Sequence, residues 1–368
     1  MRRALRTFVT PGPRMIDEFE CVASILLAIL LAHLIGAHNV AWAAFTSFVL
    51  MRGHVSETLL RGLMRLAGTA LGAGLALLVV PYAARSLPAS AAAAAIIGFV
   101  GLYGMLTAKR AYAWFLFGLT FEMILLDKLE HPAVNVIAFA ETRLLEVAAG
   151  TVACVTISLL TTLTARRRWP GPPPAPAMRI GWHPDAARHA AQAGVTLALL
   201  PVLHALFGIP ELQQAGVTIM AVMVVPVSGL GAGGLAPVSR RLLYRVLGCL
   251  GGAALAAATL FLAHGLMAHG APILIAGTCL GVIIGRHIEN GDNRATYLGL
   301  QFTLAILVTL VPDSYSDAAI RPALERLASI FIGMALLEPV LLAWHFLASR
   351  RKAEAGAVEP ARDGLGGD

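Results

Sequence analysis

The chain has 368 residues, of which 58% are hydrophobic and only 13% are charged, and its mean hydropathy is +0.75. A water-soluble fold could not bury so much apolar surface, so the composition excludes an ordinary soluble domain. The formal net charge of +7 is carried by short clusters of Lys and Arg between long uncharged stretches, a pattern that indicates repeated membrane crossings. We therefore predict an all-α polytopic membrane protein.

Twelve transmembrane helices are predicted, because a helix needs about 20 mainly apolar residues to cross roughly 30 Å of hydrocarbon. In chain order they centre near residues 28, 46, 75, 97, 119, 155, 199, 222, 255, 278, 303 and 336. The second helix, 40–51, is short, and the eighth contains Pro226 and the glycine-rich run 229–234. We expect broken or tilted helices at these two places. The uncharged stretch between Arg245 and Arg286 is long enough for a helical hairpin.

The positions of the cations predict the orientation, since Lys and Arg are retained on the cytoplasmic side during insertion. If both termini and every even-numbered loop are cytoplasmic, 23 of the 28 Lys and Arg residues lie in the cytoplasm. The five that remain outside are Arg85, Lys128, Arg143, Arg321 and Arg326. The sequence therefore predicts a multi-pass protein of a bacterial inner membrane with cytoplasmic N- and C-termini.

An internal repeat divides the chain into two halves. Residues 61–72 and 241–252 each contain two arginines four apart, a glycine three residues after the second arginine, and another glycine four residues later. The matching residues are Arg61, Arg65, Gly68 and Gly72 in the first copy and Arg241, Arg245, Gly248 and Gly252 in the second.

Two further matches lie later in each half. Gly118 matches Gly299, and Arg143 and Arg326 each stand seven residues before a glycine. The offsets between the copies are 180 for the paired arginines, 181 for the glycines and 183 for the later arginines. Six helices per half would insert both copies in the same direction, so we predict two parallel repeats related by an axis along the membrane normal.

The repeat boundaries define four regions of the chain. We predict a first six-helix repeat over 1–168, a Pro-rich cytoplasmic linker over 169–186, a second six-helix repeat over 187–349 and a polar cytoplasmic tail over 350–368. The density of proline favours an extended connection between the two repeats.

Several motifs of the first half resemble a known family. They are the apolar first helix at 21–36, the sequence Ala-Trp-Ala-Ala-Phe-Thr at 41–46 and the sequence Arg-Leu-Ala-Gly-Thr-Ala-Leu-Gly at 65–72. This pattern resembles the fusaric acid resistance (FUSC) family of aromatic-acid exporters and related integral membrane transporters. In the second half Cys249 replaces the threonine, and two glutamines at 213–214 stand where a Trp would be expected. The resemblance implies transport of aromatic carboxylic acids.

The candidate substrate site combines the duplicated arginines with an aromatic and an amide side chain. We predict a cationic vestibule that concentrates carboxylates from the cytoplasm, formed by Trp42, Arg61, Arg65, Arg241, Arg245 and Gln301. Membrane topology and contacts with lipid phosphates are the alternative explanation for the arginines. The glycine pairs have the small-xxx-small spacing that lets helices pack closely, at Gly68, Gly72, Gly248 and Gly252.

One arginine in the last helix of each predicted repeat, which we call the closing helix, is a candidate for a gate. Arg143 and Arg326 are predicted to form an outer anion gate, because they lie near the outer starts of these helices. Intrahelical ion pairs with the nearby Glu141, Glu146 or Glu325 are the alternative.

Two glutamates within predicted helices are candidates for proton coupling, because a carboxylate in a membrane is costly unless it is paired, protonated or in contact with water. They are Glu122 and Glu338. Alternatively, Glu122 is an interfacial residue close to Asp127 and Lys128, and Glu338 only precedes Pro339, which kinks its helix.

The remaining motifs restrict the class of protein. We find no nucleophile elbow, P-loop or zinc signature, and the four cysteines are isolated, so we predict no enzyme activity, no cofactor and no metal. The leading hypothesis is proton-driven export of small organic anions, with the lipid bilayer and the anion as partners and no nucleic acid. The alternatives are an anion channel similar to the plant malate channels and a structural or regulatory membrane component. The sequence leaves open a periplasmic adaptor and a homo-oligomer.

Overall fold

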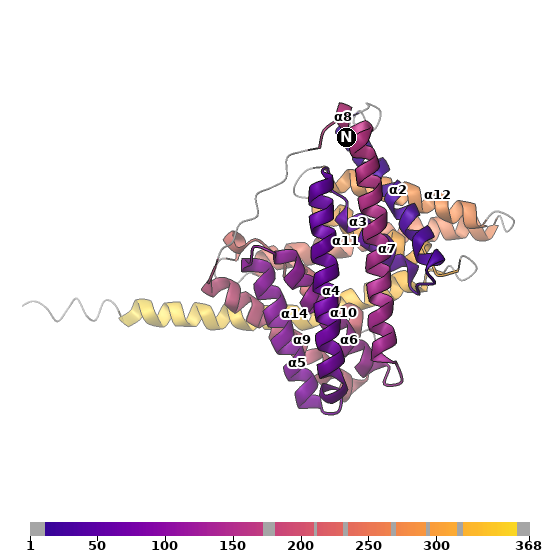
Figure 1. The fold of residues 1–368 in the computed structure, drawn as a ribbon. Coiled ribbons are helices and arrows are strands. Elements are labelled where there is room, and N and C mark those ends of the chain that lie inside the picture. Colours follow the sequence, from indigo (N-terminus) through magenta and orange to yellow (C-terminus); the bar gives the residue numbers. More distant parts are fainter. Residues whose placement is uncertain are drawn as a thin grey trace, which may run out of the picture.

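The computed structural model describes residues 12–171, 181–209, 212–230, 235–265, 270–291, 295–314 and 319–358. Within these ranges every regular element is helical (Figure 1). The first half contains α2 (Pro13–Leu34), α3 (Val40–Leu50), α4 (Val55–Ala83), α5 (Leu87–Thr107), α6 (Ala111–Glu130), α7 (Val136–Leu163) and the short α8 (Ala165–Arg168). The second half contains α9 (Pro184–Phe207), α10 (Leu212–Val222), the 3-10 turn η1 (Val227–Gly229), α11 (Leu235–Gly265), α12 (Gly270–Glu289), α13 (Thr296–Leu310) and α14 (Arg321–Val358).

The predicted helices agree with the structure. Each of the twelve predicted centres falls within one of these helices, and only the one-turn helix α8 was not predicted. Seven of the described helices are long and apolar enough to span a membrane, and α3, α10 and α13 are shorter apolar helices. The all-α polytopic membrane class is therefore confirmed, whereas twelve crossings remain a prediction.

The expected break near Pro226 is confirmed. Helix α10 ends at Val222, the turn η1 follows at Val227–Gly229, and α11 begins at Leu235. Proline has no N–H for a helical hydrogen bond, and it disfavours helical geometry in the residue before it. Residues 231–234 of the glycine-rich run lie outside the described residues.

Corresponding helices of the two halves make corresponding contacts. In the first half α6 packs on α4 and α5, and α7 packs on α2, α3 and α4. In the second half α13 packs on α11 and α12, and α14 packs on α9, α10 and α11. The contacts between the halves are also reciprocal, because α5 packs on α9 as α12 packs on α2. In Figure 1 α4 and α7 of the first half run upright, whereas α14, which corresponds to α7, runs across them. An axis along the membrane normal that relates the two halves therefore remains a prediction.

The glycine pairs lie where two helices of each half are in close contact. A Cβ atom on Gly68 would overlap the carbonyl oxygen of Ala113, and one on Gly72 would overlap that of Phe117. These contacts leave no room for a side chain between α4 and α6.

The same close approach joins α11 and α13. A Cβ atom on Gly248 would lie 2.6 Å from the carbonyl oxygen of Leu298, and one on Gly252 would overlap that of Phe302. Compared with the first half, the partner residues are offset by 185. The match of Gly118 with Gly299 in the sequence is therefore four residues, about one helical turn, out of register with the packing.

Each half caps the short second helix of the other half. At the start of α3, both carboxylate oxygens of Asp313 accept hydrogen bonds, from the N–H groups of Asn39 and Val40 at 3.0 and 2.8 Å. At the start of α10, Glu130 accepts from the N–H of Leu212 at 3.0 Å. An acidic side chain at a helix N-terminus satisfies unpaired N–H groups and complements the helix dipole. Reciprocal caps of this kind tie the two halves together.

The cap on α3 predicts a specific loss of stability. We expect Asp313→Ala to lower the stability of the folded chain by about 1 kcal/mol, because two backbone N–H groups lose their acceptor. Asp313→Asn keeps one acceptor oxygen and should lose less. Thermal unfolding of the purified protein in detergent measures both, and equal melting temperatures for wild type and Asp313→Ala would contradict the cap.

Candidate functional site

The duplicated arginines of the first half meet one tyrosine of α6. Arg65, which is buried on α4, donates a hydrogen bond to the hydroxyl of Tyr112 at 2.8 Å. Arg61 lies one turn earlier, with its guanidinium carbon 5.7 Å from the centroid of the Tyr112 ring. Arg61 also forms an ion pair with Glu57 at 3.4 Å. Tyr112 therefore holds both predicted vestibule arginines of this half.

The second half repeats this arrangement. Arg245 is only 2% exposed and donates to the hydroxyl of Tyr297 at 3.3 Å. The guanidinium carbon of Arg241 lies 4.0 Å from the centroid of the same ring. Sequence reasoning missed both tyrosines, although Tyr297 and its counterpart Tyr112 are separated by the offset of 185 and each closely follows an arginine of a predicted cytoplasmic loop.

The predicted gate residue Arg143 lies in the interior of the first half. It donates to Glu146 at 3.1 Å within α7, so the intrahelical ion pair that the sequence offered as an alternative is present. Its guanidinium carbon lies 4.3 Å from the centroid of the Trp42 ring. A cavity of about 20 Å³ is lined by Arg143, Glu146, Trp42 and Arg65, among others. The structure thus brings together residues that the sequence placed at opposite ends of the bundle.

Arg326 lies at the matching place in the second half. Arg326 and Arg245 both donate to the Oε1 atom of Gln301, at 3.2 and 3.0 Å. Arg245 also donates to the hydroxyl of Thr218 at 3.1 Å. Among the described residues, no ion pair involves Arg326, and the neighbouring Glu325 pairs with an arginine one turn earlier, not with Arg326.

A cavity of about 790 Å³ opens beside the arginines of the second half. Its lining includes Arg240, Arg241, Tyr244, Thr296 and Tyr297. The guanidinium carbon of Arg240 lies 5.4 Å from the ring centroid of Tyr244. The wall therefore presents two cations, each held against an aromatic ring.

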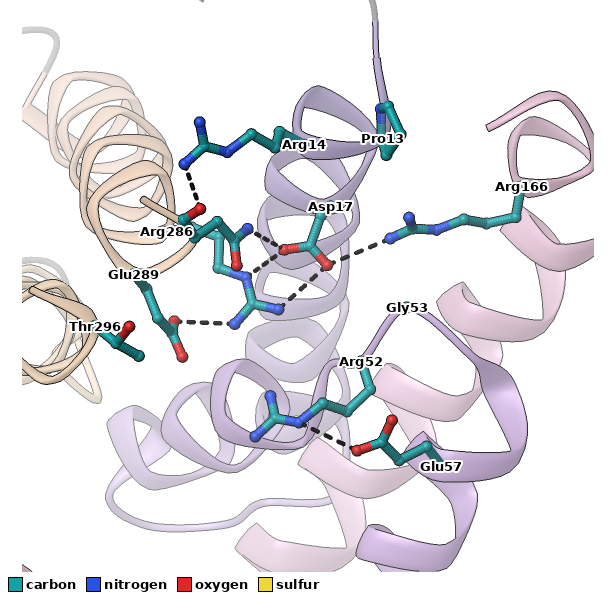
Figure 2. Close-up of a pocket in the computed structure, with 11 residues that line it drawn as sticks. Pro13, Arg14, Asp17, Arg52, Gly53, Glu57, Arg166, Arg286, Glu289 and Thr296 are labelled. Carbon is teal, nitrogen blue, oxygen red and sulfur yellow. Dashed lines mark hydrogen bonds and ion pairs between the residues drawn. The ribbon is translucent and has the colours of Figure 1, made fainter. Parts of the chain in front are cut away.

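A second cavity, of about 520 Å³, is built on ion pairs between distant segments. Figure 2 shows Asp17 of α2 between Arg166 of α8 and Arg286 of α12. The Oδ1 atom of Asp17 accepts from Arg166 at 3.3 Å and from Arg286 at 3.2 Å. Arg166 also pairs with Glu20, and Arg286 pairs with Glu289. The start of α2, the helix after α7 and the end of α12 are thereby joined.

The sequence did not identify this network, although it contains a signal. Asp17, Glu18 and Glu20 place three carboxylates at a predicted cytoplasmic end where cations are expected. In the structure all three are buried, and Glu18 contacts His287 of α12 at 2.7 Å. Thr296 lines both this cavity and the larger one, so the two adjoin.

The electrostatics of the network favour an ionised Asp17, which lies before the apolar part of α2. Burial alone would raise the pKa of Asp17, but the guanidinium groups of Arg286 and Arg166 and the amide of Asn290 hold it below its ordinary value. A carboxylate with a lowered pKa stabilises the fold while it is ionised and loses this contribution on protonation.

The two candidate coupling carboxylates have different surroundings. Glu122 is fully buried on α6, and neither of its carboxylate oxygens has a hydrogen-bond partner among the described residues. It faces α5, where a Cβ atom added to Gly98 would lie 3.5 Å from Oε1. Glu338 is half-buried on α14 and accepts from the hydroxyl of Ser239 at 2.8 Å. Neither glutamate lines the two large cavities.

Within the described ranges, no group of three or more His, Cys, Asp or Glu side chains is arranged to hold a metal ion. The chemistry offered by the site is therefore recognition by guanidinium, hydroxyl, amide and aromatic groups. Such a set suits the binding of an organic anion.

A helical bundle with several long apolar helices and buried guanidinium groups defines a multi-pass membrane protein. Residues 27–157 match the family model described as fusaric acid resistance protein-like. The match includes Trp42, Arg65, Arg143 and Glu146 and confirms the family resemblance that the sequence motifs indicated. No curated protein and no solved structure matches the chain.

The ion-pair network predicts a pH-dependent effect of one substitution. We expect Asp17→Asn to destabilise the protein by about 3–5 kcal/mol at pH 7, because a buried guanidinium loses its carboxylate partner. The difference from wild type should shrink as the pH falls from about 3.9, the ordinary pKa of Asp in the unfolded chain, towards the lower pKa of folded Asp17, because the unfolded chain then binds a proton that the folded chain binds only at lower pH. Thermal unfolding of both proteins from pH 3 to pH 7 measures this, and a difference that is independent of pH would contradict the assignment.

Proposed function

We propose that the protein exports small organic anions, chiefly aromatic carboxylates, across a bacterial inner membrane with the proton gradient as energy source. The single observation that carries this proposal is the cavity of about 790 Å³ lined by Arg240, Arg241, Tyr244 and Tyr297. Its volume is in the range of small-molecule sites.

The lining groups match the chemistry of an aromatic carboxylate. Guanidinium groups bind carboxylates through paired charge-assisted hydrogen bonds. Tyrosine rings provide apolar faces and edges for an aromatic ring. Arg241 also donates to the backbone carbonyl of Ala221 at 3.2 Å, which holds its guanidinium at the cavity wall. The side chains are thus in place before the anion arrives, which lowers the entropic cost of binding.

The same proposal includes the predicted arrangement in the membrane. Two six-helix repeats, 1–168 and 187–349, would be joined by the linker 169–186 and followed by the tail 350–368, with both termini in the cytoplasm. Matching helix contacts in the two halves support the repeats. The cavity of about 520 Å³ supports the sidedness, because its lining comes from helix ends and loops that the sequence assigns to the cytoplasm.

Glu122 is the carboxyl group best suited to proton coupling. A buried carboxylate without a hydrogen-bond partner is costly in an apolar bundle, and protonation removes that cost. An anion channel would need no such group. We assign Glu338, which has Ser239 as a partner, a secondary part in coupling.

The cavity predicts a growth phenotype. In a strain that lacks the gene, tolerance of benzoate and related aromatic acids should fall, and a plasmid with the wild-type gene should restore it. Arg241→Ala should export about tenfold less, because a charged hydrogen-bond donor is lost. Arg321→Ala removes an exposed arginine that is not among the residues lining the cavity and serves as the matched control. Unchanged tolerance of the deletion strain would contradict the export of aromatic acids.

Coupling is tested separately in proteoliposomes. We expect Glu122→Gln to abolish uphill benzoate transport driven by a pH gradient, because the amide cannot carry a proton, and Glu338→Gln to reduce it less. Benzoate flux driven by membrane potential distinguishes the alternatives. A protein that keeps uphill transport after Glu122→Gln does not use this carboxyl group, and potential-driven flux alone indicates a channel.

A further inference from the structure

The positive charge of the buried arginines is compensated differently in the two halves. Each half holds a pair of inward-facing arginines, one on the third helix of the half and one on the closing helix. In the first half Glu146 is the carboxylate partner of Arg143 and lines the small cavity that also contains Arg65. In the second half Arg245 and Arg326 share only the neutral amide oxygen of Gln301.

The residue that replaces the glutamate follows from the packing. Gly150 of α7 packs on Ala43 and Thr46 of α3. Gly333 of α14 packs on the corresponding residues of α10, Ala215 and Thr218. These two glycines are therefore equivalent.

Counting back four residues places Ser329 where the first half has Glu146. Ser329 is buried, and its hydroxyl donates to the backbone carbonyl of Arg326 at 2.8 Å. The second half thus has a neutral side chain at the place of the carboxylate.

The same comparison identifies a missing aromatic ring. Trp42 precedes Ala43 and stacks on the guanidinium of Arg143 at 4.3 Å. The residue before Ala215 is Gln214, whose Oε1 atom is buried without a hydrogen-bond partner among the described residues. Trp42 and Glu146 together give the first half an indole ring and a carboxylate beside Arg143. The equivalent positions of the second half carry neither group, and the ring beside Arg326 is that of Phe45 of α3, whose centroid lies 5.9 Å from the guanidinium carbon.

The arginines of the second half have unused donors. The Nε atoms of Arg245 and Arg326 are buried and have no hydrogen-bond partner among the described residues, and the same holds for the Nε atom of Arg65 in the first half, where Glu146 supplies a negative charge. Two buried cations with neutral neighbours are unfavourable unless an anion joins them. The side chains present therefore favour one added negative charge.

We propose that Arg245, Arg326 and Gln301 of the second half form the binding site for one aromatic monocarboxylate. Its carboxylate takes the place that Glu146 has in the first half, and its ring takes the place of Trp42. The first half is occupied by its own side chains and binds no substrate. This inference deepens the proposed function and rests on it for the direction of transport, but not for binding.

The test measures binding of radiolabelled benzoate to the purified full chain in detergent. At this site wild type should bind one benzoate per chain, in addition to any benzoate held in the cavity of about 790 Å³, and it should bind acetate at least tenfold more weakly, because acetate has no ring. S329E supplies a carboxylate from the chain itself and should weaken benzoate binding by a factor of 100 or more. S329Q adds a side chain of the same length without the charge, and its binding should be at least tenfold stronger than that of S329E.

Two further variants test the ring and the reciprocal prediction. Q214W should weaken benzoate binding at least tenfold and leave acetate binding within threefold of wild type. The double variant W42Q/E146S removes the two side chains that fill the equivalent place in the first half and should bind one more benzoate per chain than wild type. Melting temperatures and elution profiles show whether each variant is folded, and S329E should melt at a higher temperature than wild type without benzoate.

Several results would overturn the site. They are wild-type affinity in S329E, equal losses in S329E and S329Q, and a wild type that binds no benzoate. Transport distinguishes this failure from failure of the proposed function. If the binding pattern holds but wild-type proteoliposomes show no uphill transport, the site stands and the exporter does not. If S329E transports benzoate like wild type, the exporter stands and the site does not.

Discussion

A guanidinium group inside an apolar helical bundle requires a partner, and this constraint organises the protein. Removing such a group from water costs several kcal/mol, so each buried arginine must be compensated by a carboxylate, by neutral hydrogen-bond acceptors or by a bound anion. Arg143 has Glu146, and Arg286 has Asp17. Arg245 has only neutral partners, namely Tyr297, Gln301 and Thr218. The difference between these arginines separates structural cations from cations available to a ligand.

The contact of α5 with α9 and the contact of α12 with α2 differ in chemistry. Helices α5 and α9 pack so closely that a Cβ atom on Gly194 would lie 2.6 Å from the carbonyl oxygen of Ala95. The equivalent contact, between α2 and α12, contains the ion pairs of Asp17 and Arg286. An apolar contact on one side and a charged contact on the other make the bundle asymmetric despite its repeated helices. Corresponding helices of the two halves thus pack alike, while the side chains at these two contacts differ.

The sequence predicted part of the site for reasons that the structure explains. Arg61, Arg65, Arg241 and Arg245 were identified by their spacing, and the structure places each against the tyrosine of a neighbouring helix. The tyrosines were missed because they lie about 50 residues from these arginines along the chain. The equivalence of residues in α6 and α13 was also missed. The sequence matched Gly118 with Gly299, and only the helix contacts of Gly248 and Gly252 show that this match is four residues out of register.

Hydropathy and the distribution of charge were sufficient to determine the membrane class, the positions of the helices and the short second helix, because lipid imposes length and backbone hydrogen bonding on every crossing segment. The tertiary structure alone showed that Arg143 meets Arg65 and Trp42 around Glu146, and that Arg326 meets Arg245 at Gln301. Which charged side chains meet depends on their length and on how the helices pack, and the packing cannot be read from the local sequence. The partner of a buried charge is therefore a property of the folded chain.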